Sequence, residues 1–397
     1  MAKQYRSPGV FREDTFLKPA PRLATGVPGF VGFAADESPS APRKPVVLHR
    51  KEEFDTEFKR AAAGTGFLAE AVAGFFDNGG ERCYVVRAEN ADEFNREAAL
   101  LAALDALVAF DDLDLVAVPD AMALRLSGKL NLEAARRIQQ AALQQCARLG
   151  TRLAILDAPP ERNAGQLLQY RNGLTVGQAE PVNGALYYPW IKLGAGTEGL
   201  LIPPCGQVAG IYARTDVKSG VFKAPANEEV IGALDLGVIE EGKEAAIRVD
   251  NQLQDELNPA GVNCLRAFPG RGIRVWGART LSREPEWRYV NVRRLFLTLR
   301  RWIDQNMIWA TLEPNAPRLW VRIQRELTVY LTKLWRDGGL AGLAPEQAFY
   351  VKCDAETNPP DQRERGEVVT EIGLAPGAPA EFIVVRITHR VSAGEAA

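Results

Sequence analysis

Short apolar segments with the pattern of buried strands alternate with segments of helical pattern over residues 29–156. The strand-like segments are almost wholly apolar and lie at residues 29–34, 83–87, 113–118 and 153–156. The helix-like segments lie between them at residues 67–76, 92–110 and 131–149. Gly150 follows the last of these and suits the end of a helix. Alternating strands and helices favour a layer of largely parallel strands covered by helices, so we predict an α/β fold here.

Glycine and proline become frequent between about residues 173 and 277, where short apolar runs lie among predicted loops. These runs are at residues 187–190, 208–212 and 273–276. Two interpretations fit this pattern. The segment forms the rim of a pocket, because binding residues concentrate in loops, or it forms irregular packing between domains.

The last third of the chain has the pattern of a compact α+β domain. A helix over residues 291–309 places apolar residues on one face and four arginines on the other: Arg293, Arg294, Arg300 and Arg301. A second helix is predicted between Asn315, as a cap, and Gly338. Its outer face carries five cations: Arg318, Arg322, Arg325, Lys333 and Arg336. Strands are predicted at residues 348–353, 367–372 and 382–388.

These arginine-rich faces have two interpretations. Charged faces of helices are usually solvated surfaces of the protein. The alternative is that they form a docking surface for an acidic partner.

The two ends of the chain look different from the rest. Residues 1–21 lack strand or helix periodicity, but they carry separate apolar side chains that include Val10, Phe11 and Phe16. Such a segment cannot bury enough area to fold by itself, so it is either an arm that docks elsewhere or a frayed terminus. Near the other end, residues 382–388 form a strong strand pattern followed by a short tail, which suits pairing with another chain.

Sequence motifs for catalysis or cofactor binding are scarce. The chain of 397 residues has two histidines, His49 and His389, and no Cys-x-x-Cys, His-Glu-x-x-His or P-loop motif. The segment 64–69 fits a loose G-x-G-x-x-A pattern, but a helical pattern precedes it where a dinucleotide site requires a strand. Asp157 ends a predicted strand and is interpreted as a turn cap or, less readily, as a catalytic carboxylate. We predict no catalytic, cofactor or metal site.

The overall charge and the hydropathy pattern exclude several partners. The formal net charge is −2, so no excess of basic residues is present to bind nucleic acid by bulk electrostatics. No apolar run approaches the roughly 18 residues of a membrane helix, and the polar start is not typical of a signal peptide. Five scattered cysteines are typical of reduced thiols in a protein made in a cytoplasm.

Several segments, in the same order over nearly the whole chain, resemble the contractile tail sheath family. This family comprises the sheath proteins of contractile phages, phage-tail-like bacteriocins and extracellular contractile injection systems. The segments that carry the resemblance include SPGVF at 7–11, FFDNGG at 75–80, YPW at 188–190, VAGIYARTD at 208–216, VWGART at 275–280, YVNVRR at 289–294, EPN at 313–315 and AFYVKCD at 348–354. Each segment alone is weakly specific, and their shared order makes chance a poor explanation.

The resemblance implies a structural protein that is not an enzyme. Its subunits would stack as six-fold rings around an inner tube and contract from a metastable extended state, which drives the tube through a target envelope. The implied fold is mixed α/β and α+β, with four parts: an N-terminal arm (1–22), an outer α/β domain whose second half is rich in glycine and proline (23–280), a tube-facing α+β domain (281–380) and a C-terminal arm (381–397).

The resemblance also implies which surfaces bind partners. The arms would add strands to sheets of neighbouring subunits through Val10, Phe11, Phe16, Phe382, Ile383, Val384, Val385, Arg386 and Ile387. The arginines and the lysine of the two predicted helices would dock the tube or a neighbouring ring. The implied partners are further copies of the chain, the inner tube, and baseplate and terminal cap proteins, within a phage tail or a tail-like particle made in a bacterial cytoplasm. Two alternatives stay open at this point: an α/β-fold enzyme with a substrate rim, and a static tube or baseplate component.

Overall fold

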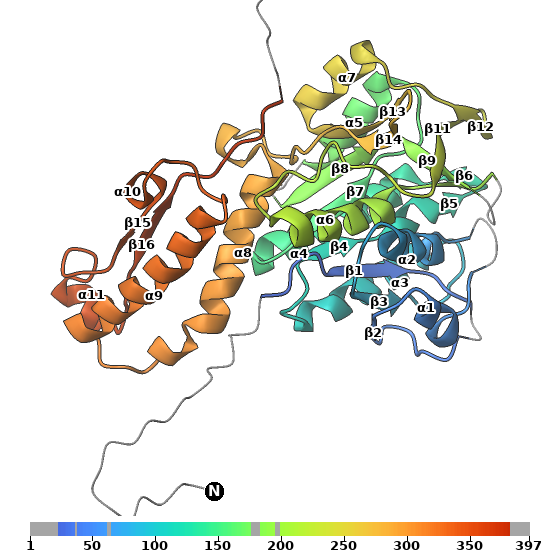
Figure 1. Ribbon diagram of the computed structural model, residues 1–397. Coiled ribbons are helices and arrows are strands. Elements are labelled where there is room, and N and C mark those ends of the chain that lie inside the picture. Colours follow the sequence, from blue (N-terminus) through green and yellow to red (C-terminus); the bar gives the residue numbers. More distant parts are fainter. Residues whose placement is uncertain (1–22, 36–37, 62–64, 176–182, 195–198, 382–397) are drawn as a thin grey trace, which may run out of the picture.

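The computed structural model describes residues 23–35, 38–61, 65–175, 183–194 and 199–381 (Figure 1). They form a large body built around one sheet and a smaller C-terminal layer beside it (Figure 1). The predicted arm residues from Val10 to Phe16 and from Phe382 to Ile387 lie outside the described residues.

An eight-stranded sheet forms the centre of the body, in the order β14-β13-β8-β7-β4-β1-β3-β2. Its strands are β1 (Pro28–Gly32), β2 (Val46–Leu48), β3 (Cys83–Arg87), β4 (Leu115–Ala117), β7 (Leu153–Asp157), β8 (Gly184–Tyr188), β13 (Val262–Phe268) and β14 (Gly272–Val275). The six inner strands are parallel, and only the two outer strands, β2 and β14, run antiparallel to their neighbours. The predicted layer of largely parallel strands is therefore confirmed.

Helices cover the sheet, and their ends follow local chemistry. They are α1 (Glu52–Glu57), α2 (Leu68–Asp77), α3 (Arg96–Asp105), α4 (Leu132–Leu149), α5 (Ala164–Leu174), α6 (Cys205–Ser219) and α7 (Asn251–Leu257). In α4 the Asn131 side chain accepts a hydrogen bond from the Ala134 N–H, and Gly150 adopts the left-handed conformation after the last turn. Every residue of β1, β3, β7 and β8 is buried, which is typical of parallel strands covered on both faces.

The Gly/Pro-rich segment contributes to the core of the body. Besides β8, β13 and β14, it forms all of a second, four-stranded sheet of β9 (Trp190–Leu193), β10 (Leu201–Ile202), β11 (Ala233–Glu240) and β12 (Lys243–Ala246). A separate hairpin pairs β5 (Arg125–Leu126) with β6 (Lys129–Leu130). The apolar run at 187–190 is buried, and Trp190 Nε1 donates a hydrogen bond to the Ala158 carbonyl. Both interpretations are therefore wrong for this run, because it ends β8 and begins β9 inside the core of the body.

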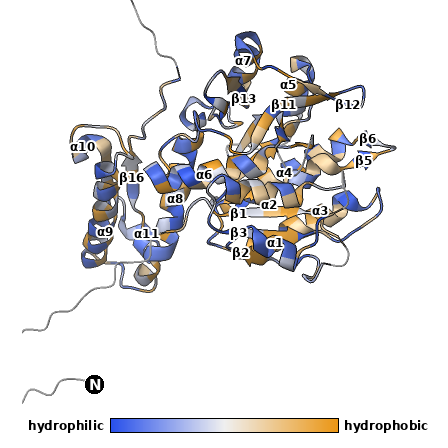
Figure 2. Ribbon diagram, turned by 45° about the vertical axis from the view of Figure 1, so that its right-hand side comes forward, coloured by the Kyte–Doolittle hydropathy of each residue, from blue (hydrophilic) through white to orange (hydrophobic). Residues whose placement is uncertain are grey.

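The C-terminal layer contains two long helices and a small sheet. Its elements are α8 (Val290–Asn306), α9 (Pro317–Arg336), α10 (Pro345–Ala348), α11 (Pro360–Glu364), β15 (Phe349–Lys352) and β16 (Glu371–Leu374). The buried face of α9 includes Leu319, Ile323 and Leu327, as its periodicity predicts. Figure 2 shows hydrophobic residues gathered in the central strands of the body, whereas α9 carries many hydrophilic residues.

Two predicted details of this layer are wrong. Asn315 does not cap α9, because its side chain accepts a hydrogen bond from Trp320 Nε1 and donates one to the Glu367 carbonyl. The strand predicted at 367–372 begins instead at Glu371, because the Asn358 side chain binds both the N–H and the carbonyl of Val369. The side chains of Asn315 and Asn358 therefore form hydrogen bonds with main-chain groups that the sequence pattern assigned to a regular strand.

Helix α8 joins the body to the C-terminal layer. Val290 and Leu297 pack in the core of the body, whereas Trp302 and Ile303 pack against the α9 cluster. One rigid helix therefore carries side chains for two hydrophobic cores, and the contacts at its middle determine how firmly the two parts are joined.

Candidate functional site

A buried ion network holds α8 against the body. Arg294 Nη1 and Nη2 donate to the two carboxylate oxygens of Asp216 at 2.7 and 2.5 Å, and Nη2 also donates to Asp114 at 3.0 Å. The side chain of Arg294 is 3% exposed. Asp114 also accepts hydrogen bonds from the N–H groups of Gly26 and Val27. The network therefore connects α8, the end of α6, the start of β4 and the first described residues of the chain.

The charges in this network stabilise one another. Burial alone would lower the pKa of Arg294, but Asp216 and Asp114 outweigh burial, so the pKa is raised and the guanidinium stays charged. The guanidinium carbon lies 5.0 Å from the centre of the Tyr212 ring, and the Tyr212 hydroxyl is 2.6 Å from that of Tyr187. A buried pair of this kind contributes little net stability, but losing one member leaves an uncompensated charge in the core.

The prediction that all four arginines of this helix lie on an outer face is wrong for Arg294 and Arg301. The Arg301 side chain is 2% exposed and donates a hydrogen bond to the Asp112 carbonyl. Arg293 is half-buried, donates to Asn183 Oδ1 at 2.6 Å and lies over the Trp287 ring, and only Arg300 is well exposed, at 58%. Helical periodicity identified a polar face, but it could not show that this face meets carboxylates of the body.

The cations of α9, by contrast, lie on its exposed face as predicted. Arg322 forms an ion pair with Glu326 and lies over the Trp309 ring, at 3.5 Å from its centre. Four cations form no ion pair with any carboxylate of the described residues: Arg318, Arg325, Lys333 and Arg336. The same face exposes Val321 by 64% and Val329 by 67%. This face of α9 is therefore basic and partly apolar, which suits a partner with acidic and apolar groups.

The small sheet of the C-terminal layer is open at its edges. It consists of β15 and β16 alone within the described residues, so each strand has one edge without a neighbouring strand. Val351 and Ile372 pack toward α9, whereas Tyr350 lies on the other face against Gly373. A strand edge of this kind is a template for pairing with another chain.

A largely apolar groove of about 770 Å³ runs beside β16. Its lining comes from α8, α9, the segment between these two helices and the segment around residue 370. The apolar lining residues include Ile303, Met307, Leu312, Ile323, Leu327, Val368 and Ile372. Ile372 belongs both to β16 and to the groove, so the two features are continuous. Leu312 is fully exposed at the rim.

The segment after β16 returns to the body and is fixed there. Asn291 Nδ2 donates to the Gly377 carbonyl at 3.1 Å. Glu381 forms a two-point ion pair with Arg279, of which the Nε–Oε1 bond is 2.8 Å, and accepts a hydrogen bond from the Tyr289 hydroxyl. Burial opposes ionisation of Glu381, but these partners outweigh it and lower the pKa of its carboxyl. The last described residue is therefore bound to the body and not to the small sheet.

The residues that the sequence offered for catalysis or cofactor binding do not come together in one site among the described residues. His49 is exposed after β2, and His389 lies outside the described residues. Asp157 is buried and accepts a hydrogen bond from the N–H of Cys205, the first residue of α6, so it holds the start of a distant helix and not the turn that follows its own strand. The part of segment 64–69 that is described starts α2, where Asp120 binds the Phe67 N–H. Across the described ranges no cluster of three potential metal ligands occurs, and no helix is both long and apolar enough for a membrane span.

Two buried carboxyls make stability depend on pH. Burial raises the pKa of both Asp120 and Asp157 to about 7, above the value of 3.8 for an unfolded chain. Their contribution to the free energy of unfolding is complete below about pH 4 and is lost as the pH rises to about 7. We expect Asp157→Asn, which keeps an acceptor for Cys205, to reduce the fall in stability between pH 5 and pH 8 by up to about 2.6 kcal/mol, since about two pKa units of the shift lie in this range.

Chemical denaturation of the wild type and the variant at both pH values measures this effect. Asp255→Asn is the matched control, because Asp255 is exposed, and it should leave the difference between the two pH values unchanged. An Asp157→Asn variant that loses as much stability as the wild type over this range would show that Asp157 is not the titrating group.

Comparison with known proteins identifies the family. The sequence matches the phage tail sheath protein central domain over residues 100–281 and the phage tail sheath C-terminal domain over residues 282–390. A tail sheath protein of Vibrio phage KVP40 is 28% identical over 185 residues, which are 46% of this chain and 26% of that protein. The chain thus aligns with about a quarter of the length of this curated relative.

Solved structures match nearly the whole chain. A chain of the anti-feeding prophage baseplate is 28% identical, with a TM-score of 0.76 over 98% of this chain and 100% of that chain. A chain of the sheath complex of an extracellular contractile injection system, PVC, in the contracted state is 27% identical, with a TM-score of 0.72 over 98% and 99%. From these matches and the ordered motifs, the chain belongs to the contractile tail sheath family, a family of structural tail proteins.

Proposed function

We propose that the chain is a structural, non-enzymatic subunit that polymerises as stacked six-fold rings around an inner tube and contracts from an extended state to a compact one. The observation that carries this proposal is the open two-stranded sheet of the C-terminal layer, with its apolar groove beside β16. A sheet of two strands is only marginally stable by itself, so added strands would stabilise it. The contracted state of the related PVC sheath complex supports the contraction step.

We assign the open sheet edges to the arms of neighbouring copies. An arm strand from residues 1–22 or 381–397 would pair with an edge. Because side chains alternate along a strand, every second side chain of the arm would point into the groove. Each main-chain hydrogen bond contributes about 1 kcal/mol net, so several per arm would keep two subunits connected. The arm residues in this role are those predicted from the sequence: Val10, Phe11, Phe16, Phe382, Ile383, Val384, Val385, Arg386 and Ile387.

We assign the tube or ring contact to α9 and not to α8. Four exposed cations of α9 form no ion pair within the described residues and can meet an acidic partner, whereas Arg294 and Arg301 of α8 are already bound inside the chain. In this arrangement residues 281–380 lie inward and residues 23–280 lie outward. Baseplate and terminal cap proteins would contact the end rings.

The fixed points of the chain suit a subunit that moves relative to its neighbours. The Arg294 network holds the segment near Gly26, and the Arg279–Glu381 ion pair holds the segment before residue 382. Both arms would therefore begin at firm positions on the body while their outer parts bind other copies. Contraction would then be a change between two packings of rigid subunits, with the energy stored during assembly.

Charge reversal on α9 tests the docking assignment. We expect the triple variant Arg318→Glu, Arg325→Glu and Arg336→Glu to fold normally and to lose assembly around the tube, because six units of charge change on one exposed face. The measurement is negative-stain microscopy of sheaths co-expressed with the cognate tube protein, with circular dichroism as the check of folding.

The matched control reverses three exposed cations of the body: Arg148→Glu, Lys218→Glu and Lys243→Glu. This control should form sheaths on tubes as the wild type does. Unchanged sheaths from the α9 variant would instead identify its cations as a solvated face. Mild denaturant on wild-type sheaths tests the contraction step, since a static component would not produce a second, shorter and wider state.

A further inference from the structure

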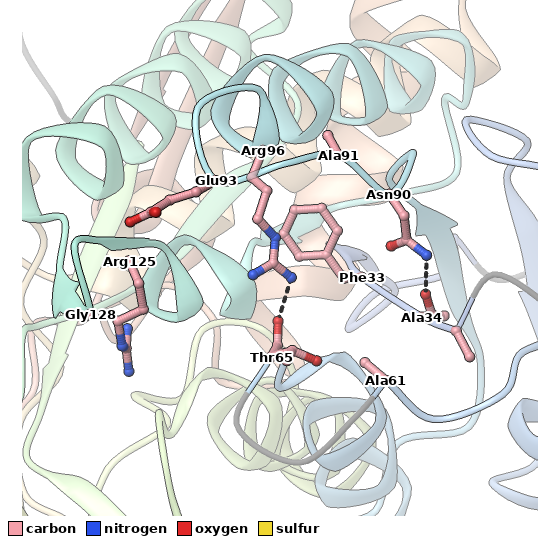
Figure 3. A pocket seen from close by; sticks show the side chains of 11 residues that line it. Phe33, Ala34, Ala61, Thr65, Asn90, Ala91, Glu93, Arg96, Arg125 and Gly128 are labelled. Carbon is pink, nitrogen blue, oxygen red and sulfur yellow. Dashed lines mark hydrogen bonds between the residues drawn. The ribbon is translucent and has the colours of Figure 1, made fainter.

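A cavity of about 610 Å³ lies in the body (Figure 3). Its lining residues fall between Phe33 and Gly128, so none of them belongs to the C-terminal layer. Its walls come from the segments that follow the carboxyl ends of three neighbouring parallel strands. Phe33 and Ala34 follow β1, Asn90 follows β3, and Arg125 follows β4. The cavity is within the range of roughly 300–1,000 Å³ that is typical of small-molecule sites.

The sheet topology marks this position as special. From β1 the chain continues to β3 on one side, whereas from β4 it continues to β7 on the other side. The winding direction of the sheet therefore reverses between β1 and β4. In open α/β sheets ligands bind in the crevice outside the carboxyl ends of the strands at such a reversal. The cavity lies at that crevice.

Two arginines supply positive charge to the cavity. Arg96, at the start of α3, places its guanidinium 4.1 Å from the centre of the Phe33 ring and donates one hydrogen bond to the Thr65 carbonyl at 2.7 Å. Arg125 Nη1 donates to the carbonyls of Met122 and Leu124. Figure 3 shows Arg96 extending toward Thr65 between the side chains of Arg125 and Asn90.

Neither arginine forms an ion pair with a carboxylate within the part of the chain that the structure describes, although the buried Asp120 lies close enough to act on the charge of Arg96. Glu93 also lines the cavity, but its carboxylate accepts a hydrogen bond from the Ser127 N–H and forms no ion pair with Arg96 or Arg125. Asp120 is buried and its two oxygens accept the N–H groups of Phe33 and Phe67. Each guanidinium has five N–H donors, so both retain donors beyond the one or two that are used.

The electrostatics of the cavity favour the binding of an anion. Burial lowers the pKa of Arg96 by more than the nearby charge of Asp120 raises it, and burial together with the charge of Arg96 lowers the pKa of Arg125. Two partly desolvated cations that repel each other are stabilised by an anion placed between them.

We propose that this cavity binds a small molecule with a carboxylate or phosphate group, which Arg96 and Arg125 hold. The Phe33 ring and the Ala34 side chain supply an apolar wall for the rest of that molecule. This site is separate from the assembly surfaces of the C-terminal layer, so its occupation requires neither the tube nor a neighbouring subunit. It adds a ligand to a subunit for which we otherwise propose a purely structural role.

Isothermal titration calorimetry of the full chain with phenyl phosphate, citrate and inorganic phosphate tests the proposal, with phenol as the neutral control. We expect at least one of the three anions to bind one site per chain in physiological salt, and phenol to bind far more weakly. Removing one charge-assisted contact should weaken binding about 10-fold to 100-fold in Arg96→Gln and in Arg125→Gln. Arg96→Lys, which keeps the charge, should lose less.

The control variant Arg148→Gln removes an exposed arginine of α4 and should bind like the wild type. Circular dichroism verifies that each variant is folded. The proposal is overturned if none of the three anions binds the wild type at millimolar concentration, or if both glutamine variants bind as tightly as the wild type. It is also overturned if an assembled sheath shows an acidic side chain of a neighbouring copy between Arg96 and Arg125.

Discussion

Replacing Arg294 by methionine is expected to lower the free energy of unfolding by about 3–5 kcal/mol. Methionine fills much of the same volume, but it leaves Asp216 without its two-point partner and Asp114 without one of its three donors. Both carboxylates are almost fully buried, so water cannot replace the guanidinium. The loss should be largest at neutral pH, because Asp216, whose pKa burial raises, would then be either an unpaired carboxylate or a protonated acid inside the core.

Chemical denaturation of the subunit measures this loss, and the same helix provides the control. Arg300→Met removes an exposed arginine six residues away and should change stability by less than about 0.5 kcal/mol. A triple variant with Arg294→Met, Asp114→Asn and Asp216→Asn should recover only part of the stability. It removes Arg294 together with both of its carboxylates, but the buried Arg301, whose Nη1 lies 3.9 Å from Asp114, loses that carboxylate. A loss below about 1 kcal/mol in Arg294→Met would contradict the buried network as the joint of α8 and the body.

Local sequence patterns were sufficient where the deciding contacts are close in the chain. Helix α4 was predicted within one residue at its start, because Asn131 and Gly150 act only on main-chain groups of their own helix. The parallel strands of the body were recognisable because strands covered on both faces are short, continuous apolar runs. The exposed and buried faces of α9 also followed from its period, since one side of that helix meets only the small sheet and its neighbours.

Patterns were insufficient where the partner is far away in the chain. The position of Arg294 in the helical period predicts an exposed side chain. Its partners Asp216 and Asp114 lie 78 and 180 residues away in the sequence, so the pattern within the helix could not reveal them. Similarly, Arg96 and Arg125 reach one cavity only because the chain passes across β1 between β3 and β4. The Arg294 network and the cavity could therefore be recognised only in the tertiary structure.

Deleting residues 382–397 is expected to leave a folded subunit that no longer forms sheaths. The deletion spares Glu381, so the ion pair with Arg279 and the contact with Tyr289 still hold the last segment to the body. Within the described residues, the core clusters of both parts are built from residues before 382, so we expect the free energy of unfolding to change little. What the deletion removes, under our proposal, is a strand that completes the sheet of a neighbouring copy.

A second variant separates the arm from its attachment. Glu381→Gln keeps residues 382–397 but replaces the charged partner of Arg279, so it should weaken the attachment and still permit sheaths, in lower yield. Negative-stain microscopy and sedimentation distinguish the two variants, because the truncation should stay as small, folded species at every concentration at which the wild type polymerises. Normal sheaths from the truncation would refute the assignment of this segment as an arm. A truncation that forms sheaths while Glu381→Gln does not would place the essential contact at the Arg279 ion pair instead.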